Sequence, residues 1–322
     1  MSDLYPFLLI PIFDERPWGV RDLRPIYTKI VNQPVGESWL TWGDSRIANG
    51  PFAGRTLGEM TRQYRRDLVG SATVYEDRFP LLVKFLFPAE KLSVQVHPDD
   101  VGAQRVGQPC GKTECWYVLQ ARPDAQVALG LKPGVTLNEF EASIGENRAE
   151  KLLNWINVRP GDMLYVAAGT VHTIGGGMVL VETQQTSDIT YRLYDYGRRR
   201  ELHIQDGIAA IKRNARAGKV GRNNGYESNV LVRSPFFQVE KMKLHESLEA
   251  SVTLESPHVV VAIDGSGIIE SAGMEPVSFA KGEAVVVPAS VPHYTLRPQW
   301  ELDVMRMSLP TGTVAEPLTV PG

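Results

Sequence analysis

The chain contains the stretch Gly161-Asp162-Met163-Leu164-Tyr165-Val166-Ala167-Ala168-Gly169-Thr170-Val171-His172. This stretch begins with a glycine and an acidic residue, continues through an apolar strand and a tight turn, and ends at a histidine eleven residues after the first glycine. The same pattern returns as Gly282-Glu283-Ala284-Val285-Val286-Val287-Pro288-Ala289-Ser290-Val291-Pro292-His293. A repeated pattern indicates a duplicated structural unit. Since each copy has a strand followed by a turn, we expect a duplicated β-sandwich.

Short apolar segments rich in β-branched residues occur throughout the chain. They are separated by turn residues, which are frequent, since the 322 residues include 29 glycines and 22 prolines. Clear examples are Phe79–Leu86, Trp116–Leu119, Met178–Val181 and Val285–Val287. Many short strands with frequent turns are typical of β-sandwiches and barrels, and not of alternating strands and helices. The sequence therefore predicts a mainly β protein.

Helices are expected to be few and short. Three segments have helical character: Thr56–Leu68, Thr136–Leu153 and Ile204–Ala217. In the second of these, Thr136 is a candidate N-cap, and Glu139 three residues later would complete a capping box.

The length of the chain favours two domains. A polar segment rich in glycine and asparagine, Arg216–Gly225, has no periodic pattern and separates the two halves. We expect a first domain over residues 1–225, which includes N-terminal strands and short helices, and a second over residues 226–322.

Composition excludes several classes of protein. The 34 Lys and Arg residues against 37 Asp and Glu residues give a net charge of −3, which argues against a nucleic-acid surface. No apolar run approaches the length of a membrane-spanning helix, and Met1–Pro6 lacks the features of a signal peptide. The two cysteines, Cys110 and Cys115, are interpreted as reduced thiols. We therefore predict a cytoplasmic protein.

Half of a metal site is predicted in the segment Ser93–Asp100. In a strand, Gln95 and His97 point to one face while the two neighbouring valines point to the other, and Pro98 then ends the strand. Glu114 and His172 are two further candidate ligands. Two imidazoles and two oxygens indicate a divalent first-row metal, with zinc as the default.

The remaining histidines lack such a setting and are interpreted as surface or core residues: His203, His245, His258 and His293. His293 occupies the position in the second copy that corresponds to His172. No Gln-x-His or His-x-His strand precedes it, so we expect the second half to bind no metal.

Gly161, Gly169 and His172 together resemble the second signature motif of the cupin superfamily, with Ala167 where that signature usually has proline. Further stretches resemble the short bacterial form of the type I mannose-6-phosphate isomerases. They are Pro11–Gly19, Gly36–Trp39, Leu92–Asp99, Gly111–Glu114 and Glu182–Arg198. The resemblance implies two cupin domains, each a double-stranded β-helix or jelly-roll, the second degenerate.

The resemblance also implies an activity: metal-dependent interconversion of mannose 6-phosphate and fructose 6-phosphate through a cis-enediol. The implied metal site uses His97, Glu114, His172 and Gln95, with one zinc ion per chain, although Gln95 could instead orient the substrate. Arg192 matches the active-site arginine of the family and is expected to stabilise the oxyanion. Glu182 and Asp188, on the segment after His172, are the two candidates for the general base, and Lys112 is expected in the catalytic set. The candidate phosphate anchors flank the ligand strands: Ser93, Lys84 and Lys112, with Arg198 as a weaker candidate.

Three alternatives remain open. The first is an isomerase of unphosphorylated mannose, because only the phosphate anchor would differ. The second is a cupin dioxygenase, which would need iron and would not need Ser93, Lys112 and Arg192 around the metal. The third is a non-catalytic sugar-binding module, which the presence of Glu182 and Arg192 disfavours. In the first two cases, as in the main prediction, the partner is a small molecule, with neither nucleic acid nor membrane involved.

Overall fold

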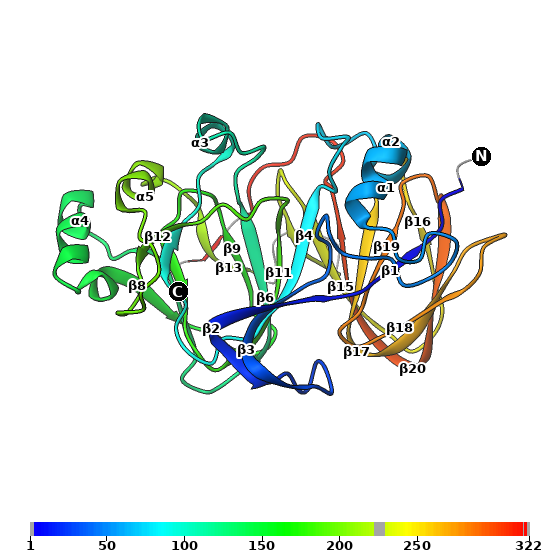
Figure 1. The fold of residues 1–322 in the computed structure, drawn as a ribbon, viewed down its shortest axis with the longest axis horizontal. Helices are drawn as coiled ribbons and strands as arrows, with labels where there is room; N and C mark the ends of the chain where they lie inside the picture. Colours follow the sequence, from blue (N-terminus) through cyan, green and yellow to red (C-terminus); the bar gives the residue numbers. More distant parts are fainter. Residues whose placement is uncertain (1–2, 222–228, 318, 321–322) are drawn as a thin grey trace.

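The computed structural model describes residues 3–221, 229–317 and 319–320. Most of its regular structure is strand, arranged in three sheets (Figure 1). Two sheets belong mainly to the first half of the sequence and the third mainly to the second half. The predicted mainly β class is confirmed.

The larger sheet of the first half has eight strands. Their order is β2 (Ile12–Asp22), β3 (Ile30–Trp39), β4 (Leu81–Leu86), β11 (Met178–Gln185), β6 (Glu114–Ala121), β9 (Met163–Val166), β13 (Ala217–Val220) and β21 (Thr319–Val320). The facing sheet has five strands. Their order is β12 (Tyr191–Tyr194), β5 (Val94–Val96), β10 (His172–Ile174), β7 (Gln126–Leu131) and β8 (Leu153–Asn157).

One apolar cluster fills part of the space between these two sheets. It combines Trp116 and Leu180 of the larger sheet with Val127 and Ile174 of the smaller one. Two sheets that share a core in this way form the sandwich of a jelly-roll. The inner faces therefore also supply the positions at which a site can be built.

The third sheet contains the strands of the second half. They are β14 (Val230–Arg233), β15 (Gln238–Leu244), β16 (Leu248–Ser251), β17 (His258–Glu270), β18 (Val277–Ala280), β19 (Ala284–Val287) and β20 (His293–Ser308). The two copies of the repeat adopt the same elements, since β9 precedes β10 and β19 precedes β20. In both copies the second strand begins at the histidine, His172 or His293.

The N-terminal strand β1 (Phe7–Leu9) also belongs to this third sheet. It pairs antiparallel with β19, with Phe7 opposite Val286. One apolar cluster contains Phe7, Leu81 of β4 and Val259 of β17, so the two halves share a core. The predicted boundary between residues 225 and 226 lies outside the described residues, and the division into two domains stays a prediction.

Helices are short. They are α1 (Leu57–Tyr64), α2 (Arg66–Val69), α3 (Asp100–Arg105), α4 (Leu137–Gly145) and α5 (Ile204–Ala210), with a 3-10 turn at Ala149–Leu152. Among the described residues, no helix has the length and apolar character needed to cross a membrane. Helices α4 and α5 lie beside the five-stranded sheet (Figure 1), where Phe140 and Ile144 of α4 pack with Val94 and Val96.

The first predicted helix is divided in two, and the other two are too long. The first is broken at Arg65, which has a φ of 46°. The second ends at Gly145, and a 3-10 turn then leads into β8, although Thr136 and Glu139 form the predicted capping box. The third ends at Ala210, because Ala217 already pairs with Val166 in the larger sheet. Strand pairing therefore overrides local helical character at the end of the last segment.

Candidate metal centre and active site

The facing sheets bring three candidate metal ligands together. Within the five-stranded sheet, His172 at the start of β10 lies opposite Gln95 of β5, and His97 follows β5 directly. Glu114 begins β6 of the larger sheet. The ligand atoms of His97, Glu114 and His172 all lie within 4.8 Å of one another, and all three side chains are buried.

Hydrogen bonds orient both imidazoles. His97 Nδ1 donates to the carbonyl oxygen of Ile189 at 2.9 Å, and His172 Nδ1 donates to the carbonyl oxygen of Thr170 at 2.9 Å. The Nε2 atoms are thus directed at Glu114, at 3.5 Å for His97 and 3.3 Å for His172. Burial, followed by the charge of Lys112, lowers the pKa of His97 to about 3, so this imidazole is neutral and can bind a metal.

The surroundings of Glu114 also bear on whether the triad can hold a metal ion. Both of its carboxylate oxygens are buried and have no hydrogen-bond partner among the described residues, although Lys112 Nζ lies 3.2 Å from Oε2. Burial acts to raise its pKa, but Lys112 and the two imidazoles lower it well below the usual range. The carboxylate of Glu114 and the two imidazoles beside it form a buried donor set that suits a divalent metal.

Gln95 lies next to this triad. Its Nε2 is 3.2 Å from His172 Nε2, and its Oε1 accepts a hydrogen bond from the Ser93 hydroxyl at 3.3 Å. The side chain also borders the adjoining cavity. This position is compatible with both predicted roles, metal ligand and substrate orientation.

A cavity of about 220 Å³ adjoins the triad. All the predicted substrate and acid–base residues except Arg198 border it: Lys84, Ser93, Lys112, Glu182, Asp188 and Arg192. The two sides of the sandwich contribute to it, since Lys84 and Glu182 stand on the larger sheet and Arg192 on the smaller one.

Lys84 is buried at the centre of a group of carboxylates. Cross-strand pairing places it opposite Trp39 of β3 and Glu182 of β11. Its Nζ lies 3.2 Å from Glu37, 3.4 Å from Asp188, 3.7 Å from Glu182 and 4.3 Å from the centroid of the Trp39 ring. Burial acts to lower its pKa, but these carboxylates outweigh burial and raise it. Lys84 therefore stays charged.

Glu182 differs from the buried carboxylates Glu37 and Glu114 because its pKa is raised and not lowered. It lies opposite Trp116 of β6, and its Oε1 accepts a hydrogen bond from the Trp116 indole at 3.0 Å. Burial, and then the charge of Glu114, raises its pKa to about 7. A carboxyl group with such a pKa can take up and release a proton near neutral pH.

Arg192 forms no ion pair with a carboxylate of the described residues. It lies opposite Gln95, and its Nη1 donates to the carbonyl oxygen of Glu201 at 2.8 Å. Its buried Nε has no hydrogen-bond partner in the described part of the chain. By contrast, Arg198 and Arg200 both form ion pairs with Asp195. Arg192 is thus free to meet an anion in the cavity.

Two residues at the site had no role in the sequence analysis. Glu37 is buried beside Lys84 and also accepts hydrogen bonds from Arg16 Nε at 3.2 Å and Trp39 Nε1 at 2.7 Å. Burial acts to raise the pKa of Glu37, but Lys84 and Arg16 bring it down to about 2. Glu37 and Arg16 both border the cavity. Arg16 lies in the motif Pro11–Gly19 and Glu37 in the motif Gly36–Trp39. A charged residue within a family motif is a signal from which both could have been proposed as site residues.

The cysteines lie outside this site. Both are free and buried, and Cys115 points to the opposite face of β6 from Glu114, into the core shared by the two halves. Burial raises the pKa of both thiols.

The jelly-roll and its buried histidine–carboxylate triad define a cupin-type protein. Comparison with known families is more specific. Residues 22–140 match the model of the catalytic domain of phosphomannose isomerase type I, and residues 227–306 match that of the mannose-6-phosphate isomerase cupin domain. This chain belongs to the type I phosphomannose isomerase family.

Individual relatives cover nearly the whole chain. The mannose-6-phosphate isomerase ManA of Bacillus subtilis is 35% identical over 90% of this chain and 95% of its own length. The mannose-6-phosphate isomerase of Streptococcus mutans is 35% identical over 89% of this chain and 93% of its own. The crystal structure of mannose 6-phosphate isomerase from Bacillus subtilis superimposes with a TM-score of 0.82 at 31% identity, covering 94% of this chain and 99% of that one.

Proposed function

We propose that this protein interconverts mannose 6-phosphate and fructose 6-phosphate through a cis-enediol. The observation that carries the proposal is the juxtaposition of a buried His97–Glu114–His172 triad with a cavity that holds both a carboxyl of near-neutral pKa, Glu182, and an unpaired cation, Arg192. Membership of the family and the names of the relatives support the same reaction.

The proposed metal is zinc, one ion per chain, held by His97, Glu114 and His172, with Gln95 as a candidate fourth ligand. When bound, a divalent ion would supply positive charge that polarises the oxygens at C1 and C2 of the open sugar. Two imidazoles and a carboxylate are an ordinary zinc donor set.

Proton transfer is assigned to the protein's carboxylates. Glu182 removes the proton from C2 and returns it to C1, because its raised pKa lets both protonation states occur near neutral pH. Asp188, which lies beside Lys84, is the alternative base. Lys112 is proposed to donate hydrogen bonds to the enediol oxygens from the triad side of the cavity.

The anionic parts of the substrate are assigned to the residues on the other side of the cavity. Arg192 would stabilise negative charge, since its guanidinium has no carboxylate partner. Ser93 and Lys84 are the proposed substrate-binding residues. The three carboxylates around Lys84 balance its charge, so it is better suited to a sugar hydroxyl than to the phosphate.

We also propose that the enzyme works in the cytoplasm on small sugar phosphates and not on nucleic acid. Its two free, buried thiols fit a reducing compartment.

The proposal is tested by metal analysis of the purified protein together with a coupled assay that compares mannose 6-phosphate with free mannose. We expect a bound divalent metal near one per chain, loss of activity after chelation, and a strong preference for the phosphorylated sugar. Equal activity on free mannose would favour the unphosphorylated alternative. Oxygen consumption by an iron-loaded protein that isomerises no hexose phosphate would refute the proposal in favour of a dioxygenase.

A further inference from the structure

Arg200 borders the active-site cavity from the loop that leads from β12 to α5. His203 N–H donates to the carbonyl oxygen of Arg192 at 2.7 Å, and this hydrogen bond closes the loop onto β12. The closed loop therefore brings Arg200 back to the cavity that Arg192 also borders, although Arg200 lies beyond the end of the strand.

A buried carboxylate fixes the side chain of Arg200. The side chain of Asp195 is only 2% exposed, and its carboxylate accepts hydrogen bonds from Nε and Nη2 of Arg200, both at 2.7 Å. A pair of this kind, made at two points, holds the guanidinium plane in one orientation. Neither bond uses Nη1, which keeps its hydrogens for another acceptor. Arg200 is thus a fixed donor at the border of the cavity.

The group of arginines around Asp195 carries excess positive charge. Arg198 shares the same carboxylate, with its Nε 3.0 Å from Asp195 Oδ1, but it does not border the cavity. Arg192 pairs with no carboxylate of the described residues. Three positive charges against the single negative charge of Asp195 leave two in excess. Burial, and then the charge of Arg200, lowers the pKa of Arg192, as expected where cations lie close together without a counter-ion.

The charges divide the cavity into two regions. Around Lys84, three carboxylates surround one ammonium, so this region disfavours an anion. At Arg192 and Arg200 the excess of positive charge favours one. An excess of two matches a phosphate monoester, which carries nearly two negative charges near neutral pH. A fixed guanidinium is also the side chain best suited to bind phosphate oxygens.

We propose that Arg200, held in place by Asp195, anchors the phosphate group of the substrate and so makes the enzyme specific for the phosphorylated sugar. This anchor rests on the proposed function, since its ligand is the phosphate of the isomerase substrate. Lys112 borders the same cavity next to Glu114 of the triad. The sugar carbons that react would lie toward Lys112 and the phosphate toward Arg200.

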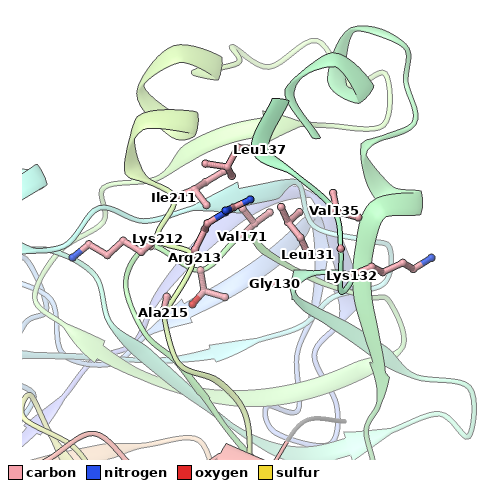
Figure 2. A pocket seen from close by; sticks show the side chains of 13 residues that line it. Gly130, Leu131, Lys132, Val135, Leu137, Val171, Ile211, Lys212, Arg213 and Ala215 are labelled. Carbon is pink, nitrogen blue, oxygen red and sulfur yellow. The ribbon is translucent and has the colours of Figure 1, made fainter. Parts of the chain in front are cut away.

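A second cavity, of about 470 Å³, is also bordered by basic residues, but their charges are exposed. It lies between residues 130–137, 169–171 and 211–215 (Figure 2). Its basic residues are Lys132, Lys212 and Arg213, all exposed, and Figure 2 shows the two lysine side chains pointing away from the cavity. The side chain of Arg200, by contrast, is only 26% exposed and is held by a buried carboxylate. These differences favour the cavity beside the triad as the phosphate site.

Isothermal titration calorimetry with glucitol 6-phosphate tests the anchor without turnover, because this sugar-alcohol phosphate has no carbonyl group to isomerise. We expect the full-length, metal-containing protein to bind it, and Arg200→Ala to bind it at least about tenfold more weakly, as for loss of a charge-assisted contact. Arg200→Lys keeps one positive charge and should recover part of the lost affinity. Unphosphorylated glucitol should bind equally weakly to the unmodified protein and to Arg200→Ala.

Arg198→Ala is the matched control. It removes an arginine from the same carboxylate but from outside the cavity, so the affinity for glucitol 6-phosphate should change less than about threefold. In Arg200→Ala, Arg198 still pairs with Asp195, so the buried carboxylate keeps a partner. Metal content and urea unfolding of each variant should therefore match those of the unmodified protein.

Steady-state kinetics supply a second measurement. In Arg200→Ala, the KM for mannose 6-phosphate should rise at least about tenfold while kcat falls less than about threefold, because the anchor binds a group that does not react. A matching rise in Arg198→Ala would overturn the assignment of the phosphate to Arg200.

Two outcomes separate the anchor from the proposed function. If the unmodified protein isomerises mannose 6-phosphate but Arg200→Ala binds glucitol 6-phosphate with unchanged affinity, the anchor is wrong and the function stands. If Arg200→Ala loses this affinity but the unmodified protein isomerises no mannose 6-phosphate, the function is wrong and the phosphate anchor stands. Absence of glucitol 6-phosphate binding to the unmodified protein up to about 10 mM would also overturn the anchor.

Discussion

Arg192 differs from Arg198 and Arg200 because no carboxylate in the described ranges pairs with it. We expect Arg192→Ala to lower turnover about 10²–10³-fold, as for loss of one donor to a developing oxyanion, while metal content stays the same. Steady-state kinetics and metal analysis of the same preparations check this. Arg198→Ala is the matched control and should keep near-normal turnover, because Arg198 pairs with Asp195 and does not border the cavity. Equal losses of turnover in Arg192→Ala and Arg198→Ala would contradict the proposed role of Arg192.

Glu37 stabilises the buried charge of Lys84. Its folded-state pKa of about 2 lies below the ordinary value of 4.5, so its contribution is fully present above pH 4.5 and is lost as the pH falls through 2. We expect Glu37→Gln to lower the free energy of unfolding at pH 7 by about 3 kcal/mol, since a buried ion pair loses one partner. The difference in the free energy of unfolding between Glu37→Gln and the unmodified protein should become smaller as the pH falls from 4.5 to 2.

Urea unfolding at pH 7 and at pH 3.5 measures both effects. Glu141→Gln, at an exposed position on α4, is the control and should change stability by less than about 0.5 kcal/mol. If Glu37→Gln loses the same free energy of unfolding at both pH values, the charge of Glu37 is not the cause of the loss.

At the level of single residues, the structure brings the predicted metal ligands close together. The period of two in a strand put Gln95 and His97 on one face, and the structure places both beside Glu114 and His172. It could not show that Lys84 lies among three carboxylates, because those contacts depend on the register of β3, β4 and β11, which pair across long separations. The contact between Glu37 and Lys84 could not be inferred for that reason, although Glu37 was visible as a charged residue within its motif.

The turn before β10 is the element that supports both histidines of the triad. Gly169 has a φ of 91°, and a Cβ at this position would lie 2.7 Å from Cγ of Lys212. We expect Gly169→Ala to cost about 3 kcal/mol in the free energy of unfolding, from backbone strain and this clash, and to weaken metal affinity about 10–100-fold.

Gly134→Ala is the control for backbone strain alone. Gly134 has a φ of 86°, but a Cβ there would meet nothing within 4 Å, so we expect a loss of about 1 kcal/mol and unchanged metal affinity. Urea unfolding and competition with a chelator supply the two measurements. Equal effects of the two substitutions on metal affinity would show that the turn does not hold the ligands.

Elements were predicted correctly where local chemistry defines them. Thr136 and Glu139 form a capping box whose atoms are three residues apart, so sequence alone identified the start of α4. The end of a helix depends instead on the tertiary partners of the next segment. Ala217 lies in β13 because it pairs with Val166 of β9. The residues around Ala217 in the sequence do not indicate this pairing.

On the scale of the whole molecule, we expect the core shared by the two halves to make them unfold as one cooperative unit. Phe7 is fully buried in the cluster that also contains Leu81 and Val259. We expect Phe7→Ala to cost about 3–5 kcal/mol and to shift the entire unfolding transition. Five of the six tryptophans lie in the first half, so fluorescence reports mainly on that half while circular dichroism reports on both.

Coincident transitions by the two methods, shifted equally in Phe7→Ala, would support a shared core. Ile30→Ala removes an apolar side chain that is 74% exposed and should change stability by less than about 0.5 kcal/mol. A fluorescence transition that stays in place while the circular dichroism transition moves would show that the halves unfold independently.

The pairing of β1 with β19 has a consequence for biosynthesis. Phe7 is made long before its partner Val286, because the whole first half of the chain lies between them. The third sheet therefore cannot close while the chain is still being made, and the apolar strand β1 must wait without its partner. During synthesis β1 therefore stays an unpaired apolar strand for the whole time that the chain between Phe7 and Val286 is being made.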